Sequence, residues 1–178
     1  MISIRTERPA DVGAREALLD VAYGPVRFTK PSQRLRERRD PALSFVAQEQ
    51  GRVIGTVRLW PVAAGGRAAL LLGPLAVHPD CRRRGVGAAL MRRALRAARE
   101  DGHAAVLLVG DASYYGRFGF TADKTGALAM AGPYEQDRLL ALEFRPGTLD
   151  GAHGVIRGGT PQRAARRAAA VSAVAHAA

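Results

Sequence analysis

A basic, glycine-containing segment in the middle of the chain has the composition of an anion-binding turn. It reads Arg82-Arg83-Arg84-Gly85-Val86-Gly87 and joins a short apolar run to a long helix-forming run. A helix start leaves main-chain N–H groups without partners and carries the positive end of the helix dipole, so it attracts anions. Because Gly85 and Gly87 have no Cβ, a phosphate can approach the main chain closely there. The segment therefore predicts a binding site for a phosphate or diphosphate group.

Two common phosphate-binding loops fit this segment poorly. A Walker A loop needs Gly-Lys-Ser/Thr after its spacer, and the chain has no such tripeptide. A dinucleotide-binding loop needs a third glycine, but Leu90 stands at that position. The turn also lies in mid-chain, after several predicted strands, rather than after the first one. These differences argue against both nucleotide-binding classes.

The elements around the turn predict a βαβ unit. Leu70–Val77 is an apolar run that Gly73-Pro74 interrupts, so an irregularity or a strand start is expected there. Gly85–Asp101 is the clearest helix, with Val86, Leu90, Ala94 and Ala97 on one face. Ala104–Val109 has the composition of a buried strand. A strand, a helix and a strand in this order predict two parallel neighbours in one sheet.

The rest of the chain predicts further strands and short helices. Helices are expected after Pro9 and Asp11, ending at Gly24-Pro25, over Ser32–Arg39, and as a short turn over Asp111–Arg117. Strands are expected over Ile2–Arg5, Leu43–Gln48, Arg52–Trp60 and Leu139–Phe144, with another beginning at Gly119-Phe120. Ala63-Ala64-Gly65-Gly66 is expected to be a loop.

The C-terminal residues differ in composition from the rest. Gly158-Gly159-Thr160-Pro161 resembles a linker, and Gln162–Ala178 is rich in alanine and arginine. We predict one domain over residues 1–157 and a tail over residues 158–178. The tail is interpreted as a frayed helix or a disordered segment, with a nucleic-acid-binding arm as the alternative.

Composition restricts the class of protein and of partner. The 178 residues include 27 basic and 16 acidic side chains, a formal charge of +11. Such a charge suits nucleic acid, a membrane surface or a phosphorylated cofactor, or else a solvated arginine-rich surface. The single cysteine, Cys81, excludes an intramolecular disulfide and makes a Cys/His metal site improbable. With neither a signal-peptide pattern nor a run of about 18 apolar residues, a cytoplasmic protein outside the membrane is expected.

The turn and the residues after it resemble one enzyme superfamily. Arg82-x-x-Gly85-x-Gly87 is similar to the Gln/Arg-x-x-Gly-x-Gly/Ala signature of the GCN5-related N-acetyltransferases (GNAT). Leu75-Ala76-Val77-His78-Pro79 resembles the strand that leads into that loop, and Tyr114–Phe120 resembles the motif after the fifth strand. With Leu107–Asp111, the chain is especially similar to the bacterial YhbS-like predicted N-acetyltransferases. The resemblance covers roughly Ile2 to Arg157.

This resemblance implies a fold and a cofactor site. The fold class is α/β (α+β), the GNAT fold: a central mixed sheet of about six or seven strands, flanked by helices and splayed like a V between two parallel strands. Leu75-Ala76-Val77 would form one arm and Ala104–Val109 the other. The pantetheine of acetyl-CoA would pair with the backbone of Leu75 and Val77, and main-chain N–H groups from Arg82 to Ala88 would hold the pyrophosphate. The implied cofactor-binding residues are Leu75, Ala76, Val77, Arg82, Arg83, Arg84, Gly85, Val86, Gly87 and Ala88.

The resemblance also implies how the reaction is catalysed. A neutral amine attacks the thioester directly, the Val77 N–H stabilises the oxyanion, and Tyr115 protonates the departing thiolate. A tyrosine pKa of about 10 suits a thiolate of pKa about 8.5. The alternative for Tyr115 is a packing aromatic, which is the role expected of Tyr114, Phe118 and Phe120. Glu49 and His78 are candidates for the general base, but neither is assigned. Asp111 is expected to organise a turn.

The predicted function is transfer of an acetyl group from acetyl-CoA, without a metal, to a primary amine of a small molecule or peptide. The alternative is a CoA-binding sensor or regulatory module that lacks catalysis. A nucleic-acid partner is not expected, since no zinc-finger or RNA-binding motif is present. The sequence leaves the oligomeric state open, with a homodimer as one alternative because dimers are frequent among similar proteins.

Overall fold

The structure, a computed structural model, describes residues 1–160. Its strands are β1 (Ile2–Thr6), β2 (Leu43–Glu49), β3 (Arg52–Ala64), β4 (Arg67–Val77), β5 (Ala105–Val109), β6 (Leu128–Ala129), β7 (Leu139–Glu143), β8 (Gly154–Val155) and β9 (Arg157–Gly158). Its α-helices are α1 (Val12–Tyr23), α2 (Pro31–Arg34), α3 (Val86–Glu100) and α4 (Ala112–Tyr115). The predicted tail covers residues 158–178, and all but its first three residues lie outside the described part.

A seven-stranded mixed sheet forms the centre of the described part, as expected of the fold class. Its main order is β1-β2-β3-β4-β5-β7, with β9 also paired to β3. All neighbours are antiparallel except β4 and β5, which are parallel. Helix α3 connects these two strands, so the predicted βαβ unit is confirmed. A separate parallel pair joins β6 and β8.

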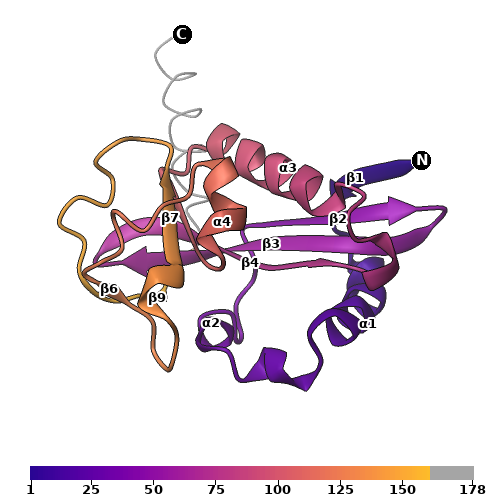
Figure 1. Ribbon diagram of the computed structural model, residues 1–178, viewed down its shortest axis with the longest axis horizontal. Coiled ribbons are helices and arrows are strands. Elements are labelled where there is room, and N and C mark those ends of the chain that lie inside the picture. The colour runs from indigo at the N-terminus through magenta and orange to yellow at the C-terminus, as the bar shows by residue number, and fades with distance from the viewer. Residues whose placement is uncertain (161–178) are drawn as a thin grey trace, which may run out of the picture.

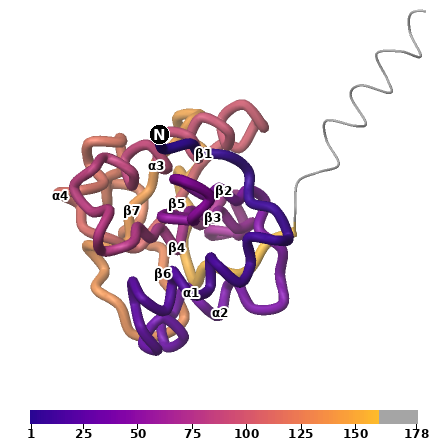
Figure 2. Tube along the Cα trace, turned by 90° about the vertical axis from the view of Figure 1, so that its right-hand side faces the viewer, coloured from indigo at the N-terminus to yellow at the C-terminus, as the bar shows by residue number. Residues whose placement is uncertain are grey.

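Helices cover both faces of this sheet. Figures 1 and 2 show α3 on one side and α1 with α2 on the other. Val86, Leu90 and Ala94 of α3 pack into the largest core cluster, whereas Leu18 and Leu19 of α1 pack against the opposite face. The alternation of strand side chains between two faces explains how one sheet supports both layers. The predicted apolar face of α3 is therefore the buried one.

The strand β4 is irregular at the dipeptide that interrupts its apolar run. The register with β3 shifts so that Leu72 pairs with Leu59 but Leu75 pairs with Val57. The intervening Gly73-Pro74 peptide bond is cis, and the indole of Trp60 donates a hydrogen bond to the Gly73 carbonyl at 2.6 Å. The expected irregularity is confirmed, and it lies where β4 separates from β5.

Three expected elements differ from the structure. The second helix covers only Pro31–Arg34, because the following residues form turns. No strand begins at Gly119-Phe120; that segment makes only one bridge, from Thr121 to Ala141. The loop predicted over residues 63–66 shrinks to Gly65-Gly66, because β3 continues to Ala64 and pairs with β4 along its whole end.

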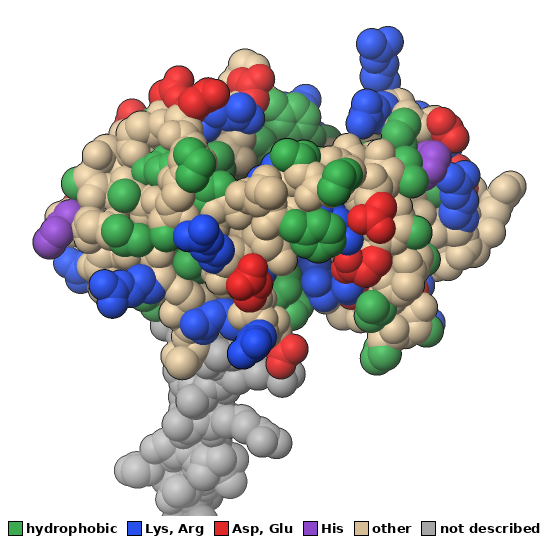
Figure 3. Space-filling model, turned by 90° about the horizontal axis from the view of Figure 1, so that it is seen from below, with side chains coloured by type: hydrophobic (Ala, Val, Ile, Leu, Met, Phe, Trp, Pro, Cys, Tyr) green, Lys and Arg blue, Asp and Glu red, His purple; other side chains and the backbone are tan. Residues whose placement is uncertain are grey.

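The described helices include none that is both long and apolar enough to cross a bilayer. On the face that carries α1 and α2, basic side chains lie among acidic and hydrophobic ones rather than in one continuous patch (Figure 3). The surplus of positive charge is therefore dispersed on that face.

Candidate active site

The turn before α3 has the backbone of an open anion-binding loop. A short 3₁₀ helix, Pro79–Cys81, follows β4, and α3 then begins at Val86. Two residues between them, Arg83 and Gly85, have left-handed backbones with φ of 62° and 77°. Glycine adopts this conformation at no steric cost, which explains its place at the first residue before α3.

Six consecutive main-chain N–H groups in this turn, from Arg83 to Ala88, donate to no acceptor among the described residues. The next donor, Ala89, already bonds the Gly85 carbonyl at 3.0 Å. The Arg82 N–H differs from the expectation, because it donates to the Pro79 carbonyl at 3.2 Å. The turn thus offers a run of donors at a helix start, the arrangement that binds phosphate oxygens.

The three arginines of the turn are not equivalent. Arg84 forms a two-pronged ion pair with Glu49, with N–O distances of 2.9 and 2.7 Å. Hydrogen bonding to Arg84 lowers the pKa of Glu49. Arg82 and Arg83 are exposed and have no ion-pair partner within residues 1–160. Glu49, a candidate general base from the sequence, is therefore bound to the turn through Arg84.

The strands β4 and β5 separate beyond a short parallel ladder. Their paired residues are Leu70 with Val106 and Leu71 with Leu107. Further along β4, the His78 N–H donates to the Ile54 carbonyl of β3 at 2.8 Å. Because hydrogen-bonded positions alternate in an antiparallel ladder, Leu75 and Val77 direct their main-chain groups away from β3. These groups face the gap between the two arms.

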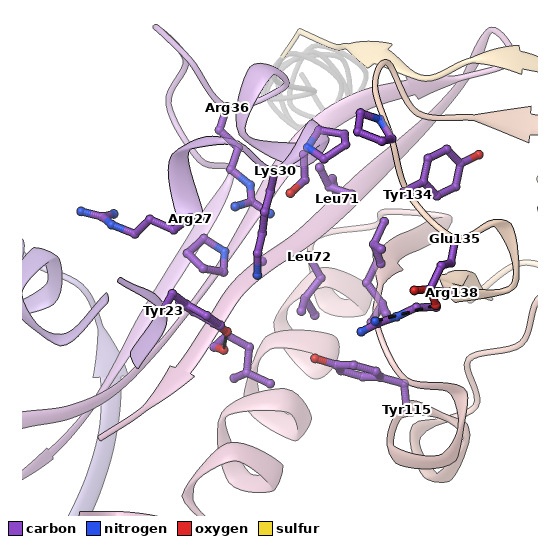
Figure 4. A pocket seen from close by; sticks show the side chains of 18 residues that line it. Tyr23, Arg27, Lys30, Arg36, Leu71, Leu72, Tyr115, Tyr134, Glu135 and Arg138 are labelled. Carbon is purple, nitrogen blue, oxygen red and sulfur yellow. Dashed lines mark hydrogen bonds and ion pairs between the residues drawn. The ribbon is translucent and has the colours of Figure 1, made fainter. Parts of the chain in front are cut away.

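A pocket of about 560 Å³ opens at this gap. Its floor is formed by β4 around the Gly73-Pro74 irregularity and by the end of β5. One wall comes from α1 and the segment through α2, and the opposite wall from residues 133–138, as Figure 4 shows. The lining side chains labelled in that view are Tyr23, Arg27, Lys30, Arg36, Leu71, Leu72, Tyr115, Tyr134, Glu135 and Arg138.

Tyr115 lies at this pocket with its hydroxyl directed toward the centre (Figure 4). Asp111 caps α4 by accepting a hydrogen bond from the Ser113 N–H at 2.8 Å, which is the turn-organising role expected for it. The Tyr115 ring packs so closely on Gly110 that a Cβ there would collide with it. It also contacts Tyr114 and Phe120 edge-on, with centroids 4.9 and 6.2 Å away. These contacts fix the ring in one orientation.

The hydroxyl of Tyr115 makes no hydrogen bond to any other described residue. Burial raises the pKa of Tyr115, and the neighbouring Tyr23 and Tyr114 raise it further. The group is therefore protonated at neutral pH and is a free hydrogen-bond donor.

The other two pocket tyrosines have committed hydroxyls. Tyr23 donates to the Leu75 carbonyl, and Tyr134 donates to the side-chain oxygen of Gln136. Burial raises the pKa of Tyr23, and the positive charges of Arg36 and Arg82 offset only part of this increase. Sequence reasoning missed Tyr23, although its spacing of four residues from Leu19 puts it on the buried face of α1.

The remaining candidates from the sequence lie around the turn rather than in the pocket. The ring of His78 contacts the Asp80 N–H at 3.3 Å and the Arg52 guanidinium at 2.7 Å, so it organises the turn. Cys81 is buried, with its sulfur 3.6 Å from Arg84. A Cβ on Gly87 would lie 3.2 Å from the Tyr114 hydroxyl, so Tyr114 borders the helix start. No three His, Cys, Asp or Glu side chains within residues 1–160 are grouped to hold a metal ion.

Comparisons with known proteins agree on one family. The sequence profile of the acetyltransferase (GNAT) family matches residues 15–120. Over 156 residues the chain is 31% identical to YhbS of Escherichia coli K12, an uncharacterized N-acetyltransferase; the match spans 86% of this chain and 93% of that protein. A second E. coli K12 protein, the uncharacterized N-acetyltransferase YjhQ, is 34% identical over 84 residues, 45% of this chain and 46% of that one.

Two solved structures are also similar over most of their length. The crystal structure of E. coli YhbS in complex with CoA has a TM-score of 0.77 and 30% identity, covering 88% of this chain and 89% of that one. A GNAT-family acetyltransferase from Brucella melitensis in complex with acetyl-CoA has a TM-score of 0.69 and 30% identity, covering 90% and 97%.

Proposed function

Because the chain belongs to the acetyltransferase (GNAT) family, we propose that it transfers an acetyl group from acetyl-CoA to a primary amine of a small molecule or peptide. The observation that carries the proposal is the free hydroxyl of Tyr115 at the gap between β4 and β5. Related proteins that bind CoA or acetyl-CoA share this fold at 30% identity, which supports the same cofactor here.

The turn and the open strand fit the two ends of such a cofactor. The partnerless N–H groups from Arg83 to Ala88 suit the pyrophosphate, and exposed Arg82 and Arg83 add positive charge beside it. The Leu75 N–H and the Val77 carbonyl suit the pantetheine amides, because they face the gap. We assign these residues, with Ala76 and the turn residues Arg84 to Ala88, to the cofactor site. Arg84 acts through Glu49, whose ion pair holds the turn in place.

Tyr115 is assigned as the proton donor. The reaction forms a bond from the amine nitrogen to the acetyl carbonyl carbon and breaks the carbon–sulfur bond of the thioester. The Tyr115 hydroxyl gives its proton to the departing sulfur and recovers one from the acceptor nitrogen, directly or through water. The Val77 N–H is assigned as the donor to the carbonyl oxygen.

The experiment that tests this proposal measures thiol release from acetyl-CoA in the presence of amines, together with direct binding of CoA. Thiol release that depends on both the amine and the protein supports acetyl transfer. CoA binding without thiol release from any amine would favour a sensor or regulatory module instead. Absence of CoA binding would reject both functions.

A further inference from the structure

The walls of the pocket carry three positive side chains with little or no compensating negative charge beside them within residues 1–160. Lys30 and Arg36 extend from one wall, and Arg138 extends from the opposite wall above Tyr115 (Figure 4). Against these three cations, Glu135 is the single carboxylate that lines the pocket within the described residues. The net charge of the side chains that line the pocket is therefore positive.

Arg36 is the most constrained of the three cations. Its Nε atom is shielded from solvent and has no hydrogen-bond partner within residues 1–160. Its guanidinium lies over the irregular part of β4, where a Cβ on Gly73 would be 2.8 Å from an Arg36 nitrogen. Burial lowers the pKa of Arg36 to about 10. A half-buried cation without a counter-charge is costly, and an anion beside it reduces that cost.

Lys30 and Arg138 act on the same space. The Lys30 ammonium lies 4.5 Å from the ring centroid of Tyr23 and makes no ion pair with a described carboxylate. Burial lowers the pKa of Lys30, and the positive charges of Arg36 and Arg138 lower it further. Arg138 has only a loose contact with Glu135, at 4.0 Å, and is half exposed. The three charges thus surround one volume from both walls.

Two observations separate this cluster from other basic residues. Arg27 also lines the pocket, but its guanidinium points away (Figure 4) and is paired with Glu16 and Asp20 at 2.7 and 2.9 Å. The residues of the phosphate-binding turn, 82–88, do not line the pocket. The cluster is therefore not needed to explain pyrophosphate binding.

We propose that the pocket selects acceptor amines that also bear an anionic group, a carboxylate or a phosphate, which Lys30, Arg36 and Arg138 bind. This inference rests on the proposed acetyl transfer for its chemistry. Charge-assisted hydrogen bonds of this kind, each worth about 1.5–3 kcal/mol, correspond to roughly a 10- to 100-fold gain in apparent affinity.

The test compares amines that differ only in the anionic group. The carboxylate pair is β-alanine against propylamine, and the phosphate pair is phosphoethanolamine against ethanolamine. Thiol release from acetyl-CoA gives kcat/KM for each amine. We expect the anionic member of at least one pair to exceed its neutral partner at least about 10-fold. Equal or better use of both neutral partners would overturn the inference while leaving acetyl transfer intact.

Variants then locate the preference. Arg36→Gln and Lys30→Gln should each collapse the ratio between anionic and neutral amine. Arg34→Gln should preserve the ratio, because Arg34 is an exposed residue of α2 that lies between them in the sequence and does not line the pocket. Circular dichroism checks folding, and Lys30→Gln serves if Arg36→Gln unfolds. A ratio that survives substitution at both positions would contradict the assigned site.

If no amine releases thiol, the proposed acetyl transfer is contradicted. A binding measurement then tests the anion site independently of catalysis. β-Alanine and phosphoethanolamine are titrated calorimetrically into CoA-saturated protein. Binding of either that is weakened in Lys30→Gln but kept in Arg34→Gln supports an anion site. Binding of neither overturns it.

Discussion

Tyr23 at the end of α1 and Tyr115 at the end of α4 face one pocket from opposite sides, and only Tyr115 has a free hydroxyl. Tyr23 donates a hydrogen bond to the Leu75 carbonyl, so it anchors α1 to the open strand β4. Both residues thus carry a phenol hydroxyl at the pocket, hydrogen-bonded in Tyr23 and, among the described residues, without a partner in Tyr115.

This difference gives a paired mutational test. Tyr115→Phe should lower kcat for acetyl transfer by about 100-fold, the lower range for loss of a general acid, with little change in CoA affinity. Tyr23→Phe should lower kcat less than about 10-fold, because its hydroxyl is already committed to Leu75. Steady-state kinetics and CoA titration measure both effects. Equal decreases of kcat in the two variants would contradict the assignment of Tyr115 as the proton donor.

A second prediction concerns the turn before α3, which we propose holds the pyrophosphate. Gly87→Val should weaken CoA binding at least about 10-fold, because the side chain would enter the space beside the N–H groups and crowd the Tyr114 hydroxyl, 3.2 Å from a Cβ. Gly13→Val is the matched control, since Gly13 is exposed in α1 with no atom within 4 Å of a Cβ. Calorimetry measures affinity and circular dichroism measures folding. If a folded Gly87→Val protein binds CoA with near-wild-type affinity, the cofactor site is not at this turn.

Glu49 supplies a third prediction. Since it pairs with Arg84 outside the pocket, Glu49→Gln should keep kcat within about twofold and leave its pH profile unchanged. A drop of about 100-fold, with loss of the limb of the profile that reports the base, would instead identify Glu49 as the general base.

A fourth prediction concerns the stability of the fold. Arg5 and the Arg8 N–H bond the carboxylate of Asp11, and these contacts lower the Asp11 pKa to about 2. A pKa lowered by folding stabilises the protein above the unfolded value of about 3.9, and the stabilisation is lost as pH falls toward 2. Asp11→Asn should therefore cost about 1 kcal/mol at pH 7, allowing for solvent screening, and the cost should shrink below about pH 4.

Urea unfolding across pH measures this cost. The exposed Asp123, whose side chain has no ion-pair partner within residues 1–160, gives the control variant Asp123→Asn, which should be close to wild type. A pH-independent difference between wild type and Asp11→Asn would mean that packing, rather than charge, explains the effect.

The sequence predicted best where local rules act alone. The strand, turn, helix and strand from Leu70 to Val109 follow from hydrophobic periodicity and from glycines at the helix start, and the structure has them in that order. Tyr115 lies at the end of the short helix α4, within the segment that the sequence predicted to form a short turn. The irregularity of β4 followed from a proline that cannot donate to a ladder.

The walls of the pocket were not predictable in the same way. Arg36 and Arg138 are far apart in the sequence, and they line one pocket only because the segment through α2 and residues 133–138 fold over the same gap. The predicted strand at Gly119-Phe120 is reduced to one bridge, from Thr121 to Ala141 of β7, because the chain turns directly after Thr121. Long-range packing decided where the two arginines lie, and no local pattern reports it.

Product analysis tests the central claim most directly. The protein is incubated with acetyl-CoA and, separately, with β-alanine, phosphoethanolamine, propylamine and a short peptide with a free amino terminus. Mass spectrometry detects the acetylated amine, and a colorimetric reagent detects free thiol. Acetyl transfer predicts equal amounts of both products with at least one amine, and neither product with Tyr115→Phe over the same short interval. A protein that binds CoA yet acetylates none of these amines would contradict it.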